Sequence, residues 1–169
     1  MTLVVQVTLI AVHILAAVVW IGGMAFLGLV VVPVMRSNGR GREASEFFHL
    51  AALRFRTVGW VCIVLLLLTG ILNLDRWGVG WSQLASASFW GSAFGQTLAV
   101  KLTLILIIVL LSGVHDFFIG PRASIAISER PASADARRLR AAASWFGRVN
   151  SLLAVAVVVY AVMLVRGVG

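Results

Sequence analysis

Four long apolar runs constrain this chain more than any other feature of its sequence. They cover residues 3–35, 57–74, 98–119 and 149–165. An α-helix needs roughly 20 residues to cross about 30 Å of hydrocarbon, so each run is near or above the length of a membrane span. Hydrophobic residues make up 61% of the chain and charged residues 12%, whereas soluble domains are about half apolar and about a quarter charged. This composition excludes a soluble enzyme and a free nucleic-acid-binding protein.

The same runs predict the fold. Because lipid offers the backbone no hydrogen-bond partners, each run must be helical, and four such helices form a bundle. We therefore expect an all-α integral membrane four-helix bundle, with residues 1–169 as a single membrane domain. The first run is about twice as long as the apolar part of a signal peptide and no Lys or Arg precedes it, so we expect it to stay in the protein. The single cysteine, Cys62, excludes an internal disulfide and a multi-cysteine metal cage.

Basic residues are unevenly distributed between the two sides of the predicted bundle. The net charge is +8, and most Lys and Arg lie in the connections 36–56 and 120–148, whereas the other side keeps only Arg76, Lys101 and Arg166. The positive-inside rule then places both connections in the cytoplasm and both termini outside it. The excess also predicts attraction to anionic lipid, so the bilayer is the expected partner and nucleic acid is not.

Two segments next to the apolar runs are also predicted to be helical. No helix breaker separates residues 43–56 from the second run, and residues 134–146 are rich in Ala and Arg. We expect these segments to extend the second and fourth helices into the cytoplasm. Small residues on the helix faces permit a homodimer or a larger membrane complex without requiring one.

Three ionisable side chains lie inside the predicted spans. They are functional candidates by default, because a charge within the bilayer is costly. At a rise of about 1.5 Å per residue, His13 lies about 9 Å and Lys101 about 10 Å toward the outside from the centres of their runs, whereas His115 lies about 10 Å toward the inside. His13 and Lys101 therefore share a level, and the two histidines lie roughly 20 Å apart in depth. This separation argues against both histidines as ligands of one metal.

The sequence suggests an outer cluster of polar side chains. It combines His13 and Lys101 with Asn73, late in the second run, and Tyr160, in the fourth. Trp20 lies on the same helical stripe as His13 and near the midplane, where its ring either stacks on a flat cofactor or packs in the core. The alternatives to a binding role are that His13 donates a hydrogen bond to a neighbouring helix and that Lys101 extends to the outer surface.

An inner cluster is predicted near the cytoplasmic end of the third run. It combines His115 with Asp116, Arg54, Asn150 and His49. For His115, an interfacial hydrogen bond or salt bridge with Asp116 is the alternative to metal binding. For His49, the alternative is a solvated side chain.

Methionine offers a further kind of metal chemistry. His13, Met24 and Met35 follow one another at intervals of 11 residues, which is close to three helical turns, so they align on one face. Thioethers favour Cu(I), and imidazole also suits copper. Steps of about 16 Å are too long for shared coordination, and Met is also an ordinary core residue. Copper binding along this face and plain core packing both remain open.

Short motifs occur in order through most of the chain. They are VHILAAVVWIGGMAFLGLVVVPVMR at 12–36, RF at 54–55, LTGILN at 68–73, FGQTLAVKL at 94–102 and GRVN at 147–150. In this order they resemble the copper-resistance CopD family of bacterial inner-membrane proteins. The resemblance implies a compact four-span member in the bacterial inner membrane that serves copper transport or tolerance, with His13 and Met24 as copper ligands.

The chain is also similar to the HemJ-type protoporphyrinogen oxidases, four-helix membrane proteins associated with haem b. The shared residues are His13 followed by Trp20, Lys101 and His115 on the third run, and Arg148 and Asn150 at the start of the fourth. The similarity implies His13 as an axial ligand of haem b, with Lys101 as the sixth ligand or as a propionate partner. The chain departs from the HemJ pattern in lacking a Pro-Arg pair after the Trp and in having Ser151 where an acid stands.

These patterns favour haem b in a redox or electron-transfer protein, with a haem-dependent oxidoreductase as its enzymatic form. The expected cofactor-binding residues are His13, Trp20, Lys101, Asn73 and Tyr160. Copper transport or tolerance is the alternative, and the candidate metal ligands are His13, His115 and Met24. A second alternative is a cofactor-free structural or assembly subunit of a membrane complex, in which His13 is a satisfied bundle histidine.

Overall fold

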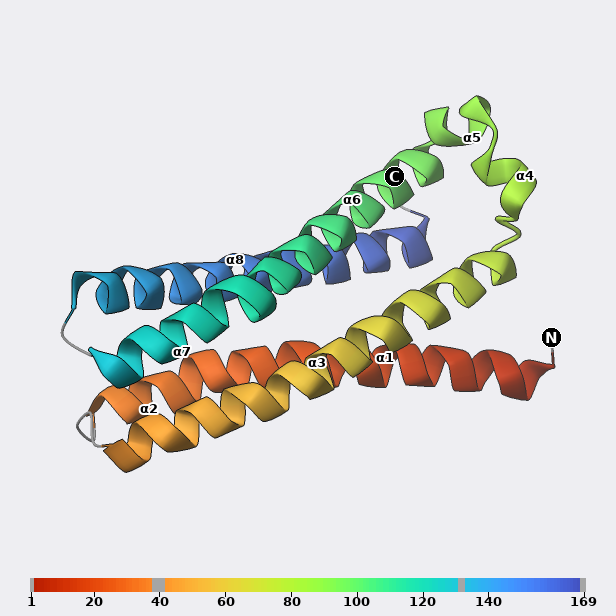
Figure 1. Cartoon of the computed structure of the whole chain (residues 1–169). Helices are drawn as coiled ribbons and strands as arrows, with labels where there is room; N and C mark the ends of the chain where they lie inside the picture. The colour runs from red at the N-terminus through yellow and green to blue at the C-terminus, as the bar shows by residue number, and fades with distance from the viewer. Residues whose placement is uncertain (1, 38–41, 131–132, 168–169) are drawn as a thin grey trace.

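The computed structural model describes residues 2–37, 42–130 and 133–167. Within these ranges the chain is helical and forms no strand, so the predicted all-α fold is confirmed. Figure 1 shows the elements along the chain. Their bounds are Leu3–Phe26 (α1), Leu27–Val31 (η1, a π-turn), Val32–Ser37 (α2), Arg42–Arg76 (α3), Trp81–Leu84 (α4), Ala87–Gly91 (α5), Ala93–Val114 (α6), His115–Ile119 (η2, a second π-turn), Gly120–Glu129 (α7) and Ala134–Arg166 (α8).

Four stretches of the described chain are long and apolar enough to cross a membrane. They are Leu3–Val34, His49–Leu74, Ala93–Ala126 and Ala134–Arg166. Each corresponds to one of the four runs predicted from the sequence, so the prediction of a multi-pass membrane protein is confirmed. The side of the membrane that each connection faces stays a prediction.

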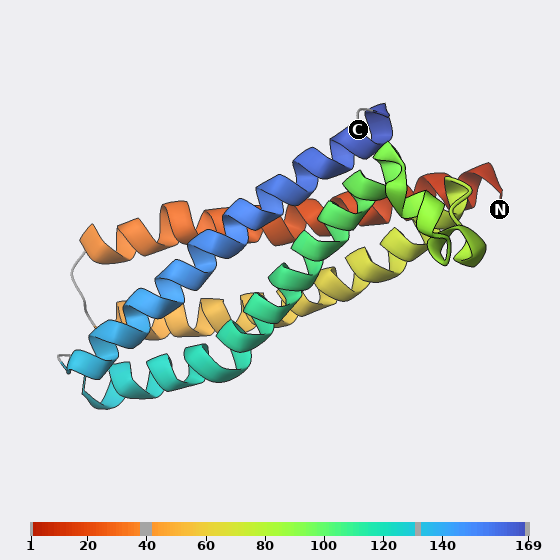
Figure 2. The same cartoon turned by 90° about the horizontal axis from the view of Figure 1, so that it is seen from above.

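The four long helices form two antiparallel hairpins. In Figures 1 and 2, α1 and α2 lie along α3, and α6 and α7 lie along α8. Contacts between α1 and α8 join the two hairpins. The short helices α4 and α5 connect the hairpins at the end of the bundle where both chain termini lie.

Two of the long helices extend well beyond the apolar runs. Helix α3 begins at Arg42 and α8 begins at Ala134, so the segments predicted as extensions are helical. The Ser133 hydroxyl accepts a hydrogen bond from the backbone N–H of Ala136 at 3.1 Å, which supplies a partner that the first turn of a helix lacks. At the other end, Gly167 adopts a left-handed φ of 64°, a conformation that commonly closes helices.

The first and third spans each contain a π-turn shortly before a proline. Turn η1 precedes Pro33, and η2 precedes Pro121. Because proline has no N–H, the helix loses one backbone hydrogen bond and the ring crowds the preceding turn. The backbone bonds five residues back instead, from the N–H of Val32 to the carbonyl of Leu27 and in the same way after η2. Figure 2 shows the chain changing direction at η2, as expected where the regular hydrogen-bond ladder is interrupted.

Small residues and one tryptophan form the core between the helices. The buried cluster contains Ala16, Trp20, Cys62, Ile63, Ile108 and Ala154. Many larger apolar side chains face outward instead, and Leu29 and Leu152 are 78% and 71% exposed. This distribution suits a lipid environment, in which small residues let helices approach closely and large ones contact acyl chains.

Candidate metal site inside the bundle

His13 on α1 is held by a hydroxyl group on α3. Its Nδ1 lies 2.7 Å from Oγ1 of Thr69, and the same hydroxyl donates to the carbonyl of Leu65 at 2.6 Å. A threonine hydroxyl has only one hydrogen to donate, so both contacts are hydrogen bonds only in the tautomer in which Nδ1 of His13 carries the proton and donates it to Thr69. The other ring nitrogen, Nε2, is left with a lone pair that can bind a metal.

The imidazole lies against the backbone of α3. A Cβ atom added to Gly70 would lie 3.6 Å from Cε1 of His13, and the histidine is half-buried while Thr69 is buried. The ring therefore lies between α1 and α3 inside the bundle, as a metal ligand must. The same hydrogen bond also agrees with the alternative interpretation, in which His13 only donates a hydrogen bond to a neighbouring helix.

Lys101 approaches the same region from α6. It is half-buried, and it is close enough to His13 for its charge to act on the imidazole. Asn73 lies one turn beyond Thr69 on α3 and Tyr160 lies on α8, and both are half-buried. Within the described ranges neither forms a hydrogen bond with His13. The structure thus relates Lys101 to His13 and leaves the roles of Asn73 and Tyr160 as predictions.

Trp20 on α1 packs in the core against α3. Its side chain is 7% exposed, and a Cβ atom added to Gly59 would lie 3.5 Å from Cδ1 of the indole. Cys62 is buried in the same cluster. The ring therefore packs against the open face of Gly59 in the core, and a role for Trp20 in binding a cofactor stays a prediction.

Three helices bring polar atoms together around Asn150. Nδ2 of Asn150 on α8 donates to Oγ of Ser112 on α6 at 3.0 Å and lies 3.9 Å from Sδ of Met24 on α1. Asn150 and Ser112 are each 8% exposed. Oδ1 of Asn150 is buried and has no hydrogen-bond partner among the described residues.

His115 is engaged by an acid near the other end of the third span. Its Nδ1 lies 2.8 Å from Oδ1 of Asp116, and Oδ2 of that carboxylate accepts a hydrogen bond from Nε1 of Trp60 at 2.9 Å. The guanidinium of Arg56 donates to the Asp116 carbonyl at 3.4 Å. Arg54, the arginine expected here, is exposed. This arrangement agrees with the interfacial salt bridge that was the alternative to metal binding by His115.

The three predicted metal ligands do not share one coordination sphere. His13 bonds to Thr69 on α3, and Asp116, the partner of His115, bonds to Trp60 on the same helix. Thr69 and Trp60 are nine residues apart, so the two histidines lie at levels about 13 Å apart along α3. Met24 follows His13 by 11 residues, or about 16 Å. Across the described part of the chain, no three His, Cys, Asp or Glu residues are grouped so as to hold a metal. Any metal would have to bind at separate positions.

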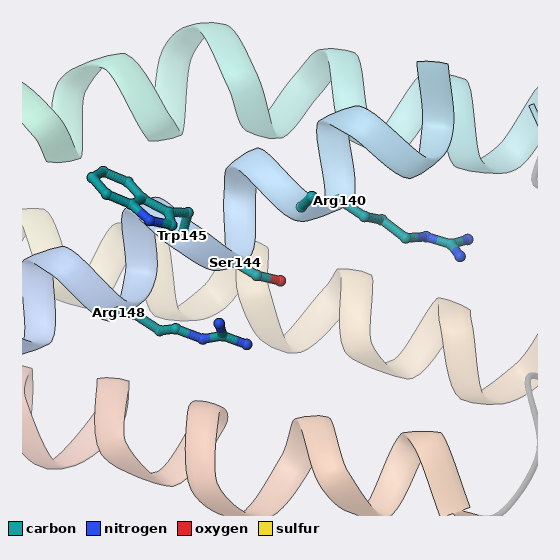
Figure 3. Close-up of a pocket in the computed structure, with 5 residues that line it drawn as sticks. Arg140, Ser144, Trp145 and Arg148 are labelled. Carbon is teal, nitrogen blue, oxygen red and sulfur yellow. The ribbon is translucent and has the colours of Figure 1, made fainter. Parts of the chain in front are cut away.

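The N-terminal part of α8 carries a shallow basic pocket. Its volume is about 330 Å³, and it is lined by Arg140, Ala141, Ser144, Trp145 and Arg148. Figure 3 shows the two arginines and Ser144 spaced along one side of the helix, with the indole beside them. None of the residues that line this pocket is one of the candidate metal ligands His13, Met24 and His115.

His49, expected in the inner cluster or as a solvated side chain, is exposed, and its Nδ1 lies 3.1 Å from Oγ of Ser124 on α7. The sequence does not identify several polar residues of the interior. These residues are Thr69, Ser112 and Trp60, the partners of His13, Asn150 and Asp116. Single hydroxyl residues inside apolar runs were the available signal, because such a group needs a partner within lipid.

The fold and its inward polar side chains define a multi-pass membrane protein with candidate metal ligands in its interior. The family model for CopD, copper resistance protein D, matches residues 49–164. This range is more than half of the chain, and the protein belongs to the copper resistance protein D family. The match begins within α3, so α1 with His13 and Met24 lies outside it.

One relative covers most of the chain. A curated protein of Aquifex aeolicus (strain VF5), named only as an uncharacterized protein, is 27% identical over 147 residues, which are 86% of this chain and 85% of the relative. No solved structure matches the chain. Family membership identifies a copper-resistance-related membrane protein, while the similarity to HemJ-type oxidases and the binding of haem stay predictions.

Proposed function

We propose that this protein binds Cu(I) inside the bundle and passes it across the bacterial inner membrane in copper transport or tolerance. The observation that carries this proposal is the hydrogen bond of 2.7 Å between Nδ1 of His13 and Oγ1 of Thr69. It fixes the ring between α1 and α3 and leaves Nε2 free. A metal-binding histidine usually has its other nitrogen engaged in this way. Membership of the copper resistance protein D family supports copper as the ion.

The charge near His13 favours a monovalent ion. Lys101 acts on the imidazole from α6, and the repulsion between an ammonium and a metal ion grows with the charge of the ion. The ammonium of Lys101 therefore repels Cu(I) less strongly than Cu(II) at this position. An imidazole nitrogen suits copper, and Cu(I) also accepts soft thioether and thiolate ligands further along a path.

Cys62 shortens the distance between successive soft donors. Cys62 lies in the core cluster against which Met24 packs. It precedes Thr69, the partner of the histidine, by seven residues, or about 10 Å along α3. Phe55 on α3 lies against Gly23, the neighbour of Met24 in the chain, so it marks the level of Met24 on α3. Phe55 precedes Cys62 by seven residues, or about 10 Å along the helix. Cys62 therefore lies between the level of His13 and the level of Met24 along α3.

Cu(I) titration tests the proposal. Purified wild-type protein in detergent is titrated without oxygen against a chromophoric Cu(I) chelator, beside His13→Ala and the control His49→Ala. We expect wild type to compete with the chelator, His13→Ala to bind at least about tenfold more weakly, as for loss of a ligand or its support, and His49→Ala to match wild type. Wild-type protein that takes no Cu(I) from the chelator contradicts the proposal.

Haem b binding is a second candidate function, favoured by one observation. The charge of Lys101 on α6 acts on the imidazole of His13 on α1, and a four-helix bundle can hold a haem between two such side chains. Protein supplied with haem would then show a Soret band that His13→Ala abolishes. Wild-type protein that gains no such band after haem supplementation rules this function out, and the haem-dependent oxidoreductase with it.

We also propose how the chain lies in the membrane. The basic connections 36–56 and 120–148 face the cytoplasm, and residues 1–169 act as one membrane domain with both termini outside the cytoplasm. The uneven distribution of Lys and Arg supports this orientation. His13 then lies toward the extracytoplasmic side, where an incoming ion would first meet it. A homodimer or a larger membrane complex stays a prediction from the small-residue helix faces.

A further inference from the structure

The basic pocket on α8 presents two positive charges and no carboxylate. Its volume is about 330 Å³, and Arg140, Ser144 and Arg148 follow one another at intervals of four residues, so they share one face of the helix. Figure 3 shows both guanidinium groups extending toward the same end of the helix, with the Ser144 hydroxyl between them in this view. Neither arginine forms an ion pair within the described chain. The pocket therefore holds two charges that lack a counter-ion from the chain.

A second pocket, lined by α7 and the start of α8, has balanced charges. Its volume is about 340 Å³, and it is lined by two arginines, Arg122 and Arg130, and by two carboxylates, Glu129 and Asp135. The two pockets thus match in size and in the number of arginines and differ in net charge. Carboxylates of the chain compete with an outside anion only in the second pocket. The basic pocket is therefore the better site for an anion.

The side chains of the basic pocket define the chemistry of its ligand. Arginine and the indole of tryptophan can only donate hydrogen bonds, and a serine hydroxyl can also donate one. Their complement is an anion with several acceptor oxygens. Arginine pairs with phosphate through two parallel hydrogen bonds, which makes a phosphate group the best match for this set of donors.

The position of the basic pocket along α8 indicates that the phosphate belongs to a lipid. The apolar run 149–165 contains no charged residue and begins directly after Arg148, so the pocket lies where the helix leaves the hydrocarbon. Trp145 is 61% exposed, and exposed indoles are typical of the headgroup layer. Phosphates at this level are those of phospholipid headgroups.

We propose that Arg140, Ser144 and Arg148 bind the headgroup phosphate of an anionic phospholipid such as phosphatidylglycerol, with the indole of Trp145 beside the lipid. An anionic headgroup is favoured over a zwitterionic one, because the ammonium of a zwitterionic headgroup would be repelled by the two guanidinium groups. The site is specific to α8 and does not depend on the proposed copper function.

Native mass spectrometry of the full-length protein in detergent tests the site by counting the lipids that it binds. Wild type is compared with the double variant Arg140→Gln, Arg148→Gln and with the matched control Arg122→Gln, Arg130→Gln, which removes the same charge from the second pocket. The probes are phosphatidylglycerol, phosphatidylcholine and glycerol 3-phosphate. We expect wild type to prefer phosphatidylglycerol and the first variant to bind its tightest equivalent at least about tenfold more weakly, because each arginine near the membrane surface attracts anionic lipid. The control is expected to match wild type.

A single substitution at an exposed position accompanies the double variants. Arg148→Gln leaves the half-buried Arg140 in place, and it is expected to weaken the same lipid equivalent in the same direction. Three results would overturn the proposal. Equal losses in both double variants would mean that only net charge matters, and equal affinities of wild type for the two lipids would mean that the pocket does not select an anionic headgroup. Displacement of the lipid by an equal concentration of glycerol 3-phosphate would identify a soluble phosphate ester as the ligand instead.

Discussion

At the scale of single residues, Thr69 decides which nitrogen of His13 can bind a metal. The threonine hydroxyl donates to Leu65 and accepts from Nδ1 of His13, so the free lone pair belongs to Nε2. In metal sites such a second partner fixes both the tautomer and the direction of the ring. Thr69 is therefore a positioning residue for any ion bound at His13.

Thr69→Val is the sharpest test of that role. Valine has nearly the shape of threonine but no hydroxyl, so the helix stays intact while the ring loses its partner. We expect the affinity of purified protein for Cu(I) to fall about 10- to 100-fold. Thr103→Val is the matched control, because Thr103 is exposed on α6 and its hydroxyl bonds only to the Ala99 carbonyl. Equal affinities of Thr69→Val and wild type would show that Thr69 does not position the ligand.

The sequence predicted His13 in the interior but not its partner. Placement inside a span follows from the length of an apolar run, which is a local property. The partner depends on the register of α1 against α3, and that register is set by contacts such as those of Gly23 with Phe55 and of Trp20 with Gly59. A single sequence does not fix such contacts, because any of the small residues on α1 could meet α3.

At the scale of the elements, the hairpin of α1 and α3 depends on close approach at Gly23. A Cβ atom there would collide with the ring of Phe55, whereas one at Gly22 would meet nothing within 4 Å. The helical runs themselves were predictable from their apolar length. The π-turns before Pro33 and Pro121 were not predicted, because the sequence shows the proline but not how the backbone absorbs it.

The two neighbouring glycines give a matched pair of substitutions. We expect Gly23→Ala to destabilise the protein by about 1 kcal/mol or more, because the ring of Phe55 must move in a packed interface. Gly22→Ala should be neutral or slightly stabilising, since alanine favours helix and the position is open. Thermal unfolding in detergent measures both. A Gly23→Ala variant as stable as Gly22→Ala would mean that the hairpin tolerates a wider separation.

Helix α8 carries its own prediction, in the basic pocket of Figure 3. Neither Arg140 nor Arg148 forms an ion pair within the described chain, and arginine beside an interfacial tryptophan suits a lipid phosphate. We expect the double variant Arg140→Gln, Arg148→Gln to retain less phosphatidylglycerol on purification than wild type. Arg138→Gln, an exposed arginine of the same helix outside the pocket, serves as the control. Unchanged lipid content in the double variant would show that the pocket does not select anionic lipid.

At the scale of the whole molecule, the two ends of the bundle differ in charge. The termini, α4 and α5 lie at one end, and α2, the start of α3, the end of α7 and the start of α8 lie at the other. Most of the arginines belong to that second end, so the positive-inside rule predicts that this end faces the cytoplasm. The direction in which an ion would pass from His13 to Met24 depends on this orientation.

Cysteine labelling measures the orientation directly. Cys62 is the only cysteine and is 5% exposed, so wild-type protein gives a low background with a membrane-impermeant maleimide. Ser82→Cys places an exposed thiol on α4, and Ala134→Cys places one at the start of α8. In intact spheroplasts we expect the thiol at position 82 to react at once and the thiol at position 134 to react only after the membrane is opened. The reverse pattern would place the basic connections outside the cytoplasm, and His13 would then be the last ligand that an ion entering from outside meets.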